Sequence, residues 1–504
     1  MTVSWEWMKS AAAKNPRIES LFADNSERLS RFSLDVNCGD AALYFDFSKT
    51  HLTDDDLKNF AKMAEALDLS GARDRLFGGE VVNITEERAA EHSAERGTGA
   101  AEAVEMAYGL RQRMYGLVAA IQAEAFGEIN HLIHIGIGGS ALGPELLCDA
   151  LTREDAQCDV HIVSNVDGAA LAQAFAACDP QKTMIAIASK TFTTTETLRN
   201  AESAVNWLKQ EGVEDPYGRC IALTASPDKA SEWGIDDARI LPFSETVGGR
   251  YSLWSSIGFP FALAGGQEAF DALLAGAAAM DEHFRDAPFE KNAPILATCV
   301  DQYYARGRKA QSRAIFAYDE RLRLLPDYLQ QLEMESNGKS ATLAGEAVNA
   351  STAAISWGGV GTDAQHAVFQ LLHQGTHILP IEFVASAEPG HDLDPEHHAI
   401  LLSNCFAQGA ALMQGRASDD PHRHYAGDRP STTILLDDVT PAALGALIAF
   451  YEHRVFANAV FMQINPFDQF GVELGKVIAK SIANEPDQQF DPSTQKLLSR
   501  VGLR

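Results

Sequence analysis

Six hydroxyl side chains and one lysine lie within nine residues of this chain, directly after an apolar segment. Residues 184–188 have the length and character of a buried strand, and Ser-Lys-Thr-Phe-Thr-Thr-Thr-Glu-Thr follows as residues 189–197. Residues 198–209 then read as a helix. The first turn of a helix has unpaired N–H groups and the positive end of the helix dipole, so hydroxyls and an ammonium placed there favour an anion such as phosphate. A hydroxyl-rich helix cap without a ligand is the alternative, although one cap needs only one or two hydroxyls.

A glycine-rich turn, Gly136-Ile-Gly-Gly-Ser-Ala-Leu-Gly143, follows another apolar segment. It loosely matches the dinucleotide-binding pattern, which also needs an acidic residue at the end of the next strand. That strand ends at Val163-Ser164-Asn165, and Asp167 lies beyond it in a turn. The glycines therefore favour a close approach of the backbone to a sugar or phosphate, with Ser140 as a polar contact. A tight turn without any ligand remains the alternative.

Two further segments carry charge beside glycine. Val247-Gly-Gly-Arg-Tyr-Ser-Leu-Trp254 places Arg250 where it could stabilise a developing oxyanion. Glu333-Met-Glu-Ser-Asn-Gly-Lys339 places carboxylates beside an Asn-Gly turn, and a carboxylate can act as a general base at neutral pH. A solvated surface arginine and an exposed acidic loop are the ordinary interpretations of these two segments.

His366 and Lys476 each lie on a predicted helix. Residues 365–374 predict a helix that ends at Gly375, with His366 and Gln370 on one face. His366 and His373 are poorly spaced for a metal without other ligands nearby, and a structural histidine is the common case. A solvated lysine is likewise the common outcome for Lys476.

The elements that must position these side chains alternate between strand and helix. Residues 1–115 are expected to be largely helical, with a helix start at Thr85-Glu-Glu-Arg88. After residue 116, helical stretches separate apolar segments of strand length, which predicts βαβ units with parallel strands. A second block of this kind follows the proline-containing segment 286–294, and the last hundred residues are mostly helical. Strands are expected at residues 131–137, 160–164, 184–188, 220–224, 314–317 and 378–384.

Composition limits the class of protein. A chain of 504 residues is too long for one core, so we expect two or more domains. The net charge, 41 minus 69 or −28, opposes binding to nucleic acid or to an anionic membrane. The first twenty residues show no signal peptide and no segment is long enough to span a bilayer. Seven scattered cysteines without a C-x-x-C pair indicate reduced thiols in a cytoplasm, not a disulfide or zinc framework.

Taken together and in order, these segments resemble the phosphoglucose isomerase family, across roughly residues 44–480. The resemblance includes the Gly-Gly-Ser turn, the Ser-Lys-Thr-Phe-Thr-Thr loop and Gly-Gly-Arg-Tyr-Ser-Leu-Trp-Ser. It continues through residues 287–294, residues 330–339, Gln365-His366 and residues 467–476. The resemblance implies an α/β fold of two sugar-isomerase, or SIS-like, doubly wound parallel-sheet domains with helical N- and C-terminal parts. The large domain would comprise residues 1–115 and 285–504, and the small domain residues 116–284.

The resemblance also implies the activity and the site. The chain would interconvert glucose 6-phosphate and fructose 6-phosphate through an enediolate, in glycolysis and gluconeogenesis, without a metal or cofactor. Glu335 would be the base, Arg250 would stabilise the enediolate, and His366 and Lys476 would open the ring. A homodimer is implied, with His366 reaching into the partner's site. Substrate-binding roles would fall to Gly139, Ser140, Ser189, Lys190, Thr191, Thr194, Gln331 and Gln469.

The chain departs from the family pattern at two places. Before Gln365 the family usually has Gly-Glu-Pro-Gly-Thr-Asn-Gly, and here residues 358–364 are Gly-Gly-Val-Gly-Thr-Asp-Ala. Ala364 adopts a positive φ less easily than glycine, so the loop next to His366 is expected to differ. Glu91 and Glu95 also stand where the family has leucines, which affects the expected packing there.

Two other functions are consistent with parts of the sequence. A non-catalytic sugar-phosphate sensor would need the phosphate loop but not Glu335, Arg250, His366 and Lys476 together. A nicotinamide-dependent oxidoreductase is disfavoured by the missing acidic residue after the second strand.

Overall fold

The computed structural model describes residues 5–14, 16–485 and 487–503, in two compact units. The first unit is Met1–Pro466 and the second is Phe467–Arg504. The first holds both sheets, and the second contains α18 (Glu473–Asn484) and α19 (Pro492–Arg500). No helix among the described residues is long and apolar enough to cross a membrane.

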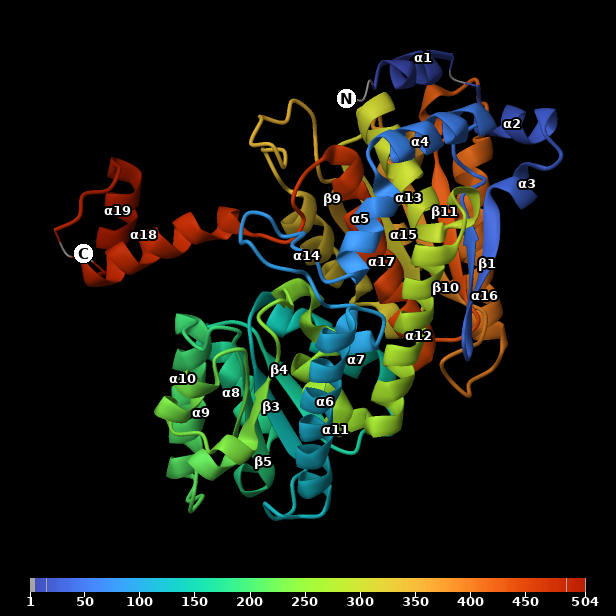
Figure 1. Cartoon of the computed structure of the whole chain (residues 1–504). Helices are drawn as coiled ribbons and strands as arrows, with labels where there is room; N and C mark the ends of the chain where they lie inside the picture. Colours follow the sequence, from blue (N-terminus) through green and yellow to red (C-terminus); the bar gives the residue numbers. More distant parts are fainter. Residues whose placement is uncertain (1–4, 15, 486, 504) are drawn as a thin grey trace. The chain divides into compact units, whose positions relative to one another are not determined.

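A five-stranded sheet occupies the middle of the chain (Figure 1). All of its neighbouring strands run parallel, in the order β4-β3-β5-β6-β7. Four of these strands were predicted and are confirmed to within two residues at each end, whereas β7 was not predicted. The strands are β3 (His131–Ile135), β4 (Asp159–Val163), β5 (Thr183–Ala188), β6 (Cys220–Thr224) and β7 (Ile240–Pro242).

Helices cover both faces of this sheet, as a doubly wound fold requires. Apolar residues of one face, including Ile133, Ile135 and Ile185, pack against residues of α8 and α9 such as Leu171 and Ala204. The helices of that side are α8 (Gly168–Ala177), α9 (Thr195–Gln210) and α10 (Pro227–Trp233). On the other side in Figure 1 lie α6 (Ala101–Gln122), α7 (Leu142–Leu151) and α11 (Phe259–Gly265).

The first compact unit also contains a six-stranded sheet, with its strands in the order β1-β2-β11-β10-β8-β9. Its last four strands are parallel, whereas β1 and β2 form an antiparallel hairpin that joins the edge of β11. The strands are β1 (Ser33–Cys38), β2 (Ala41–Asp46), β8 (Ser312–Tyr318), β9 (Ile355–Val360), β10 (Ile381–Ser386) and β11 (Ser431–Leu436).

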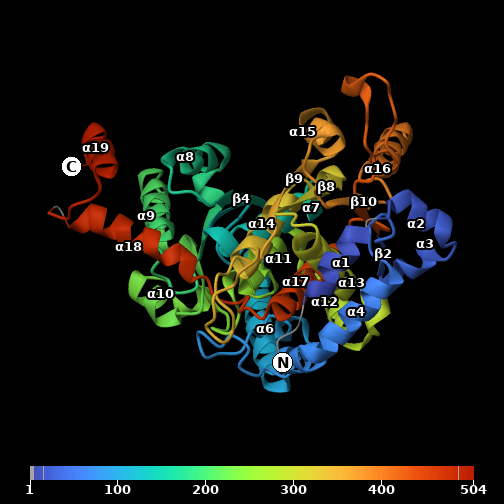
Figure 2. The ribbon, with the colours of Figure 1, turned by 90° about the horizontal axis from the view of Figure 1, so that it is seen from above.

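Helices also cover both faces of the six-stranded sheet (Figure 2). On one face, Phe369 and Leu372 of α15 (Asp363–Gln374) and Leu412 of α16 (Glu396–Gln414) pack on Phe316 and Phe383. The other face carries α12 (Gln267–Asp286), α13 (Ala293–Gln302) and the almost wholly buried α17 (Pro441–Met462). The α/β class, with two doubly wound sheets, is confirmed. The division into residues 1–115 with 285–504 and residues 116–284 stays a prediction.

The expected helical character of residues 1–115 is only partly correct. Helices are present at α1 (Glu6–Lys14), α2 (Ile18–Asp24), α3 (Arg28–Arg31), α4 (Asp54–Ala66), α5 (Leu69–Phe77) and the start of α6. The hairpin β1–β2 was missed. In β1 the buried residues Leu34, Val36 and Cys38 alternate with more exposed ones, which is the two-residue period of a strand with one face in the core.

The expected helix start at Thr85–Arg88 is wrong. Asn83 and Arg88 pair as an antiparallel bridge around a turn in which Glu87 has a φ of 54°. The Asn83 amide donates to Glu86 Oε2 at 2.7 Å and its oxygen accepts from Asn465 Nδ2 at 2.9 Å. These side-chain bonds give the backbone an alternative to a helix, as asparagine often does.

Candidate functional site

The hydroxyl-rich segment forms the loop between β5 and α9, as the sequence predicts. Ser189 Oγ lies 3.1 Å from Thr194 Oγ1, and Thr191 Oγ1 lies 2.8 Å from Thr193 Oγ1. Thr194 is the N-cap residue of α9, yet its side chain accepts no capping hydrogen bond. The capping alternative therefore does not account for the Thr194 hydroxyl, and four hydroxyls of this loop contact one another in pairs before α9 begins.

Lys190 connects this loop to the segment that precedes Arg250. Its Nζ donates to the carbonyl oxygens of Glu245 at 2.6 Å and of Val247 at 2.9 Å. Burial, helped by the nearby charge of Arg88, lowers the pKa of Lys190 to about 8. The ammonium thus supports the backbone beside Gly248 as well as adding positive charge to the loop.

Arg250 is a buried arginine and not a solvated one. It lies in the short 3₁₀ helix η6 (Gly249–Trp254) and is 3% exposed. Its Nη1 lies 3.1 Å from Glu335 Oε1, its Nε donates to Ser336 Oγ at 2.6 Å, and its Nη2 donates to the carbonyl oxygen of Pro466. The Tyr251 hydroxyl lies 2.8 Å from the same Ser336 Oγ. These contacts fix the plane of the guanidinium.

Glu335 stands in the last turns of α14 (Leu325–Asn337) and not in an exposed acidic loop. Gln331, one turn earlier, donates from Nε2 to Glu335 Oε2 at 2.6 Å. The carboxylate therefore receives one donor on each oxygen, from Arg250 and from Gln331. Its side chain is 22% exposed, so solvent still reaches it. A carboxylate held in this way can act as a base toward a molecule that enters from solvent.

The glycine-rich turn packs directly against this pair. Gly138 has a φ of 60°, and a Cβ added there would lie 3.0 Å from Gln331 Nε2. A Cβ at Gly139 would lie 2.2 Å from the carbonyl carbon of Gly249, so only glycine fits beside η6. The buried His134 of β3 holds the turn, with Nε2 2.6 Å from the Ser140 carbonyl oxygen. Burial lowers the pKa of His134 to about 4, which keeps the imidazole neutral.

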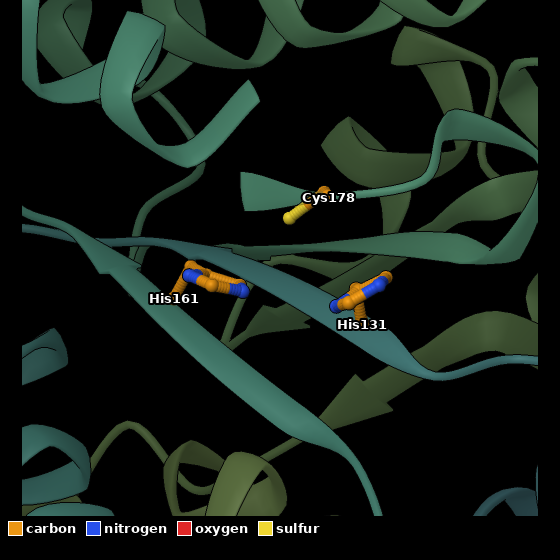
Figure 3. Close-up of side chains that lie close together, drawn as sticks. All are labelled: His131, His161 and Cys178. Atoms are coloured by element: carbon orange, nitrogen blue, oxygen red, sulfur yellow. The ribbon is translucent and has the colours of Figure 1, made fainter. Parts of the chain in front are cut away.

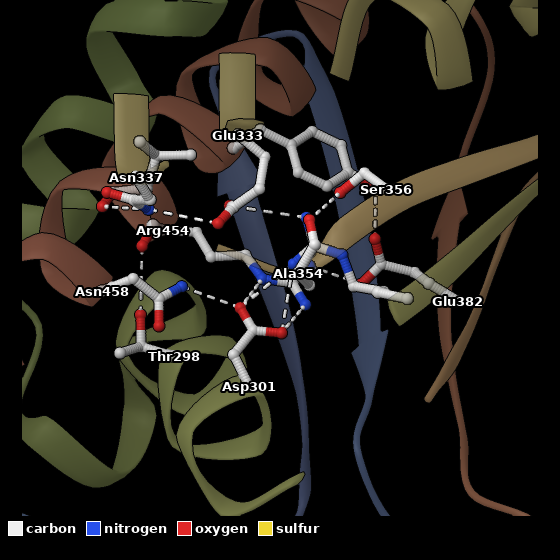
Figure 4. A network of polar contacts seen from close by, with 12 residues as sticks. Thr298, Asp301, Glu333, Asn337, Ala354, Ser356, Glu382, Arg454 and Asn458 are labelled. Carbon is white, nitrogen blue, oxygen red and sulfur yellow. Dashed lines mark hydrogen bonds and ion pairs between the residues drawn. The ribbon is translucent and has the colours of Figure 1, made fainter. Parts of the chain in front are cut away.

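A buried polar network anchors the end of α14 that carries Glu335 (Figure 4). The Asn337 amide donates to Glu333 Oε1 and to the Val455 carbonyl oxygen of α17, each at 3.2 Å. In the same network Arg454 donates to Asp301 and Glu382, which lie on α13 and β10. Glu333 thus has a structural contact, and the end of α14 is tied to α17, which is tied in turn to α13 and β10.

His366 lies on α15, as the sequence predicts, and its side chain is exposed. Among the described residues it makes no hydrogen bond or ion pair, so the structure does not bring it to Glu335 within one chain.

The backbone of the loop before His366 accommodates the residues that depart from the family pattern. Ala364 is buried in the first turn of α15 and has no positive φ, while Gly358 lies in β9, where a Cβ would be 1.7 Å from the Ile315 carbonyl oxygen.

Gln469 and Lys476 belong to the second compact unit. Gln469 precedes the 3₁₀ turn η12 (Phe470–Val472), and Lys476 is exposed on α18. Their predicted roles stay predictions.

Sequence reasoning missed the residues that hold the site together. His134 lies within an apolar strand, and Ser336 directly follows Glu335 in the sequence. Neither residue is part of a sequence pattern that indicates a role. Asp167, the only acidic residue near the end of β4, caps α8 by accepting from the Ala169 N–H at 3.0 Å. It is therefore engaged where a ribose-binding carboxylate would be needed.

The fold and this site define a doubly wound α/β protein with a hydroxyl-rich loop, a positioned carboxylate and a buried arginine. The chain belongs to the phosphoglucose isomerase family, whose model matches residues 46–498. It is 62% identical to a glucose-6-phosphate isomerase of Rhizorhabdus wittichii, over 99% of this chain and 98% of the relative. It is 60% identical to that of Zymomonas mobilis, over 98% and 97%. A crystal structure of a glucose-6-phosphate isomerase from Chlamydia trachomatis superposes with a TM-score of 0.90 at 28% identity, covering 98% of each chain.

Proposed function

We propose that this chain interconverts glucose 6-phosphate and fructose 6-phosphate by ring opening and proton transfer through a cis-enediolate. The observation that carries the proposal is the Glu335 carboxylate, held between Arg250 and Gln331 beside the Gly138–Ser140 turn. The names of the relatives point to the same reaction. The enzyme would serve glycolysis and gluconeogenesis.

Substrate binding is assigned to two groups of residues. Ser189, Lys190, Thr191 and Thr194 surround the start of α9, where the helix dipole and free N–H groups attract the phosphate. Gly139, Ser140, Gln331 and Gln469 contact the sugar. Lys190 links the two groups, because it donates to the backbone just before the segment that carries Arg250.

Catalysis needs one proton moved between neighbouring carbons. Glu335 takes the proton from C2 of the open aldose, the C–H electron pair forms the enediolate, Glu335 returns the proton to C1, and the hydroxyl proton of O2 passes to O1. Arg250 balances the charge that develops on the oxygen, as a buried fixed cation can. His366 and Lys476 open the ring. No metal or nucleotide takes part in these steps.

A homodimer with shared sites is part of the proposal. Leu371 on α15 and Ile400 and Phe406 on α16 are 42%, 53% and 46% exposed. Hydrogen bonds from Gln365 to Asn404 and between His373 and Gln408 place these two helices side by side. An apolar surface next to an exposed His366 fits a two-fold interface through which His366 enters the partner's site.

The location of the protein and its partners are inferred from the cysteines and the net charge. The seven cysteines are free thiols, which agrees with a cytoplasmic location. The net charge of −28 opposes nucleic acid and an anionic membrane surface as partners.

A coupled assay tests the function. Purified protein is given fructose 6-phosphate, and product is detected with glucose-6-phosphate dehydrogenase and its nicotinamide cofactor. We expect reduction of the cofactor that depends on both proteins. Reduction without the coupling enzyme would indicate an oxidoreductase, and no product despite saturable binding of fructose 6-phosphate would indicate a sensor.

A further inference from the structure

Two histidines and a cysteine gather at a place that the proposed reaction does not use. One ring nitrogen from each of His131 and His161 and the Cys178 Sγ all lie within 4.8 Å of one another. Figure 3 shows the two imidazoles and the sulfur directed toward a common space. The three residues are far apart in the sequence, so no motif indicates them.

The topology of the five-stranded sheet brings the three together. In the parallel pairing of β3 and β4, His131 lies opposite Asp159 and Ile133 opposite His161. Residues two apart on a strand share a face, so both imidazoles project to the same side of the sheet. That side is the one covered by α8, and Cys178 directly follows the last residue of α8. The cluster therefore joins two strands and the end of the helix between β4 and β5.

One ring nitrogen of each histidine has no hydrogen-bond partner among the described residues. His131 Nδ1 and His161 Nε2 are buried and make no hydrogen bond. Buried ring nitrogens without partners cost free energy, and most native ones are satisfied by protein or by another bound species. An Asp159 carboxylate oxygen lies 3.6 Å from His131 Nδ1, too far for a hydrogen bond, and that side chain is 67% exposed.

We propose that His131, His161 and Cys178 bind one divalent metal ion of the zinc class, with Asp159 or a water molecule as the fourth ligand. Two imidazoles and a thiolate are the donors that Zn²⁺ takes in tetrahedral sites, and hard ions such as Mg²⁺ and Ca²⁺ select oxygen instead. Binding forms a metal–sulfur bond and releases the thiol proton of Cys178 to water.

The site is structural and not catalytic. His131 begins β3, whereas the Gly138–Ser140 turn follows the opposite end of that strand. An ion there ties β3, β4 and α8 together without touching the substrate. We therefore expect metal binding to raise the unfolding temperature and to leave the isomerase rate constant unchanged.

Cobalt(II) is the probe for the experiment, because thiolate coordination to Co²⁺ gives a charge-transfer absorption in the near ultraviolet. Full-length protein is treated with a chelator, freed of it and titrated with Co²⁺. We expect the band to saturate at one ion per chain and to disappear on addition of Zn²⁺. Absence of the band in the chelator-treated wild-type protein would overturn the proposal without any variant.

Matched variants locate the ion. Cys178→Ala should lose the band. His161→Ala should weaken Co²⁺ binding by more than about tenfold, since loss of even an outer-shell partner lowers metal affinity by about that factor. Cys148→Ala and His391→Ala, which remove a thiol and an imidazole elsewhere, should bind as the wild type does. Coupled isomerase activity reports that each variant is folded. A band of full strength in folded Cys178→Ala would place the ion elsewhere and overturn the assignment.

Discussion

At the scale of single residues, the account depends on the Glu335 carboxylate. Glu335→Gln keeps the shape of the side chain but cannot take a proton. We expect kcat to fall by about 10²–10⁴-fold, while binding of the sugar phosphate is kept. Coupled kinetics and calorimetric binding of fructose 6-phosphate measure the two quantities. Glu320→Gln, which changes an exposed glutamate, is the control. A Glu335→Gln enzyme with undiminished kcat would remove Glu335 from the mechanism.

Lys190 makes the alkaline side of the pH profile informative. Its pKa is lowered to about 8, so the free enzyme loses this charge as the pH rises through that value. We expect kcat/KM to fall above about pH 8. Lys190→Ala should lower kcat/KM near neutral pH by about ten- to a hundredfold, the worth of one charge-assisted contact, and should lack the alkaline decrease.

The matched control for that profile is Lys209→Ala, at an exposed position near the end of α9.

The lowered pKa of Lys190 also makes the stability of the fold depend on pH. Between about pH 8 and 10.5 the unfolded state binds more protons at this lysine than the folded state, so its contribution to stability increases with pH there. An unchanged inhibition constant for inorganic phosphate in Lys190→Ala would show that the ammonium serves only the backbone at residues 245–247.

The sequence alone could single out a candidate site where several unusual side chains share one loop. The segment 189–197 has far more hydroxyls than a cap needs, and the structure leaves the Thr194 hydroxyl uninvolved in capping. The contacts of Arg250 and Glu335 could not be read in this way, because 85 residues separate them in the chain. Only the packing of η6 against α14 brings them to 3.1 Å.

At the scale of elements, the glycine-rich turn has a strict steric requirement. Gly139→Ala would put a Cβ 2.2 Å from the Gly249 carbonyl carbon, so either the turn or η6 must move. We expect a loss of stability of about 1–3 kcal/mol together with a lower kcat/KM, because Arg250 follows Gly249. Gly168→Ala is the control, since a Cβ there meets nothing within 4 Å. Wild-type kinetics and urea denaturation for Gly139→Ala would contradict this account of the turn.

The strands β7, β9 and β11 were missed, and the six other parallel strands were predictable because each is a short apolar segment followed by a turn and a helix. The hairpin β1–β2 was not, since its alternating pattern lies in a region of helical texture. The error at Thr85–Arg88 has a different cause. Asn83 forms side-chain bonds whose partner Asn465 is almost four hundred residues away, and a local pattern contains no such information.

At the scale of the whole molecule, shared active sites predict complementation between two inactive variants. Homodimers of Glu335→Gln and of His366→Ala should each be nearly inactive. In a mixed dimer one active site contains both substitutions and the other contains neither, so up to about half of the wild-type activity should return. Refolding the two variants together and isolating the heterodimer measures this. Heterodimers no more active than their parents would mean that His366 does not cross the interface.

Isomerisation by proton transfer through Glu335 is tested most directly in deuterium oxide. Purified protein is incubated with fructose 6-phosphate, with no nicotinamide cofactor present, and both sugars are followed by nuclear magnetic resonance. The account predicts glucose 6-phosphate carrying deuterium at C2, with exchange at C1 of the remaining fructose 6-phosphate, and neither in Glu335→Gln. Fructose 6-phosphate that stays unconverted and unexchanged with the wild-type protein, or equal deuterium incorporation by the variant, would contradict it.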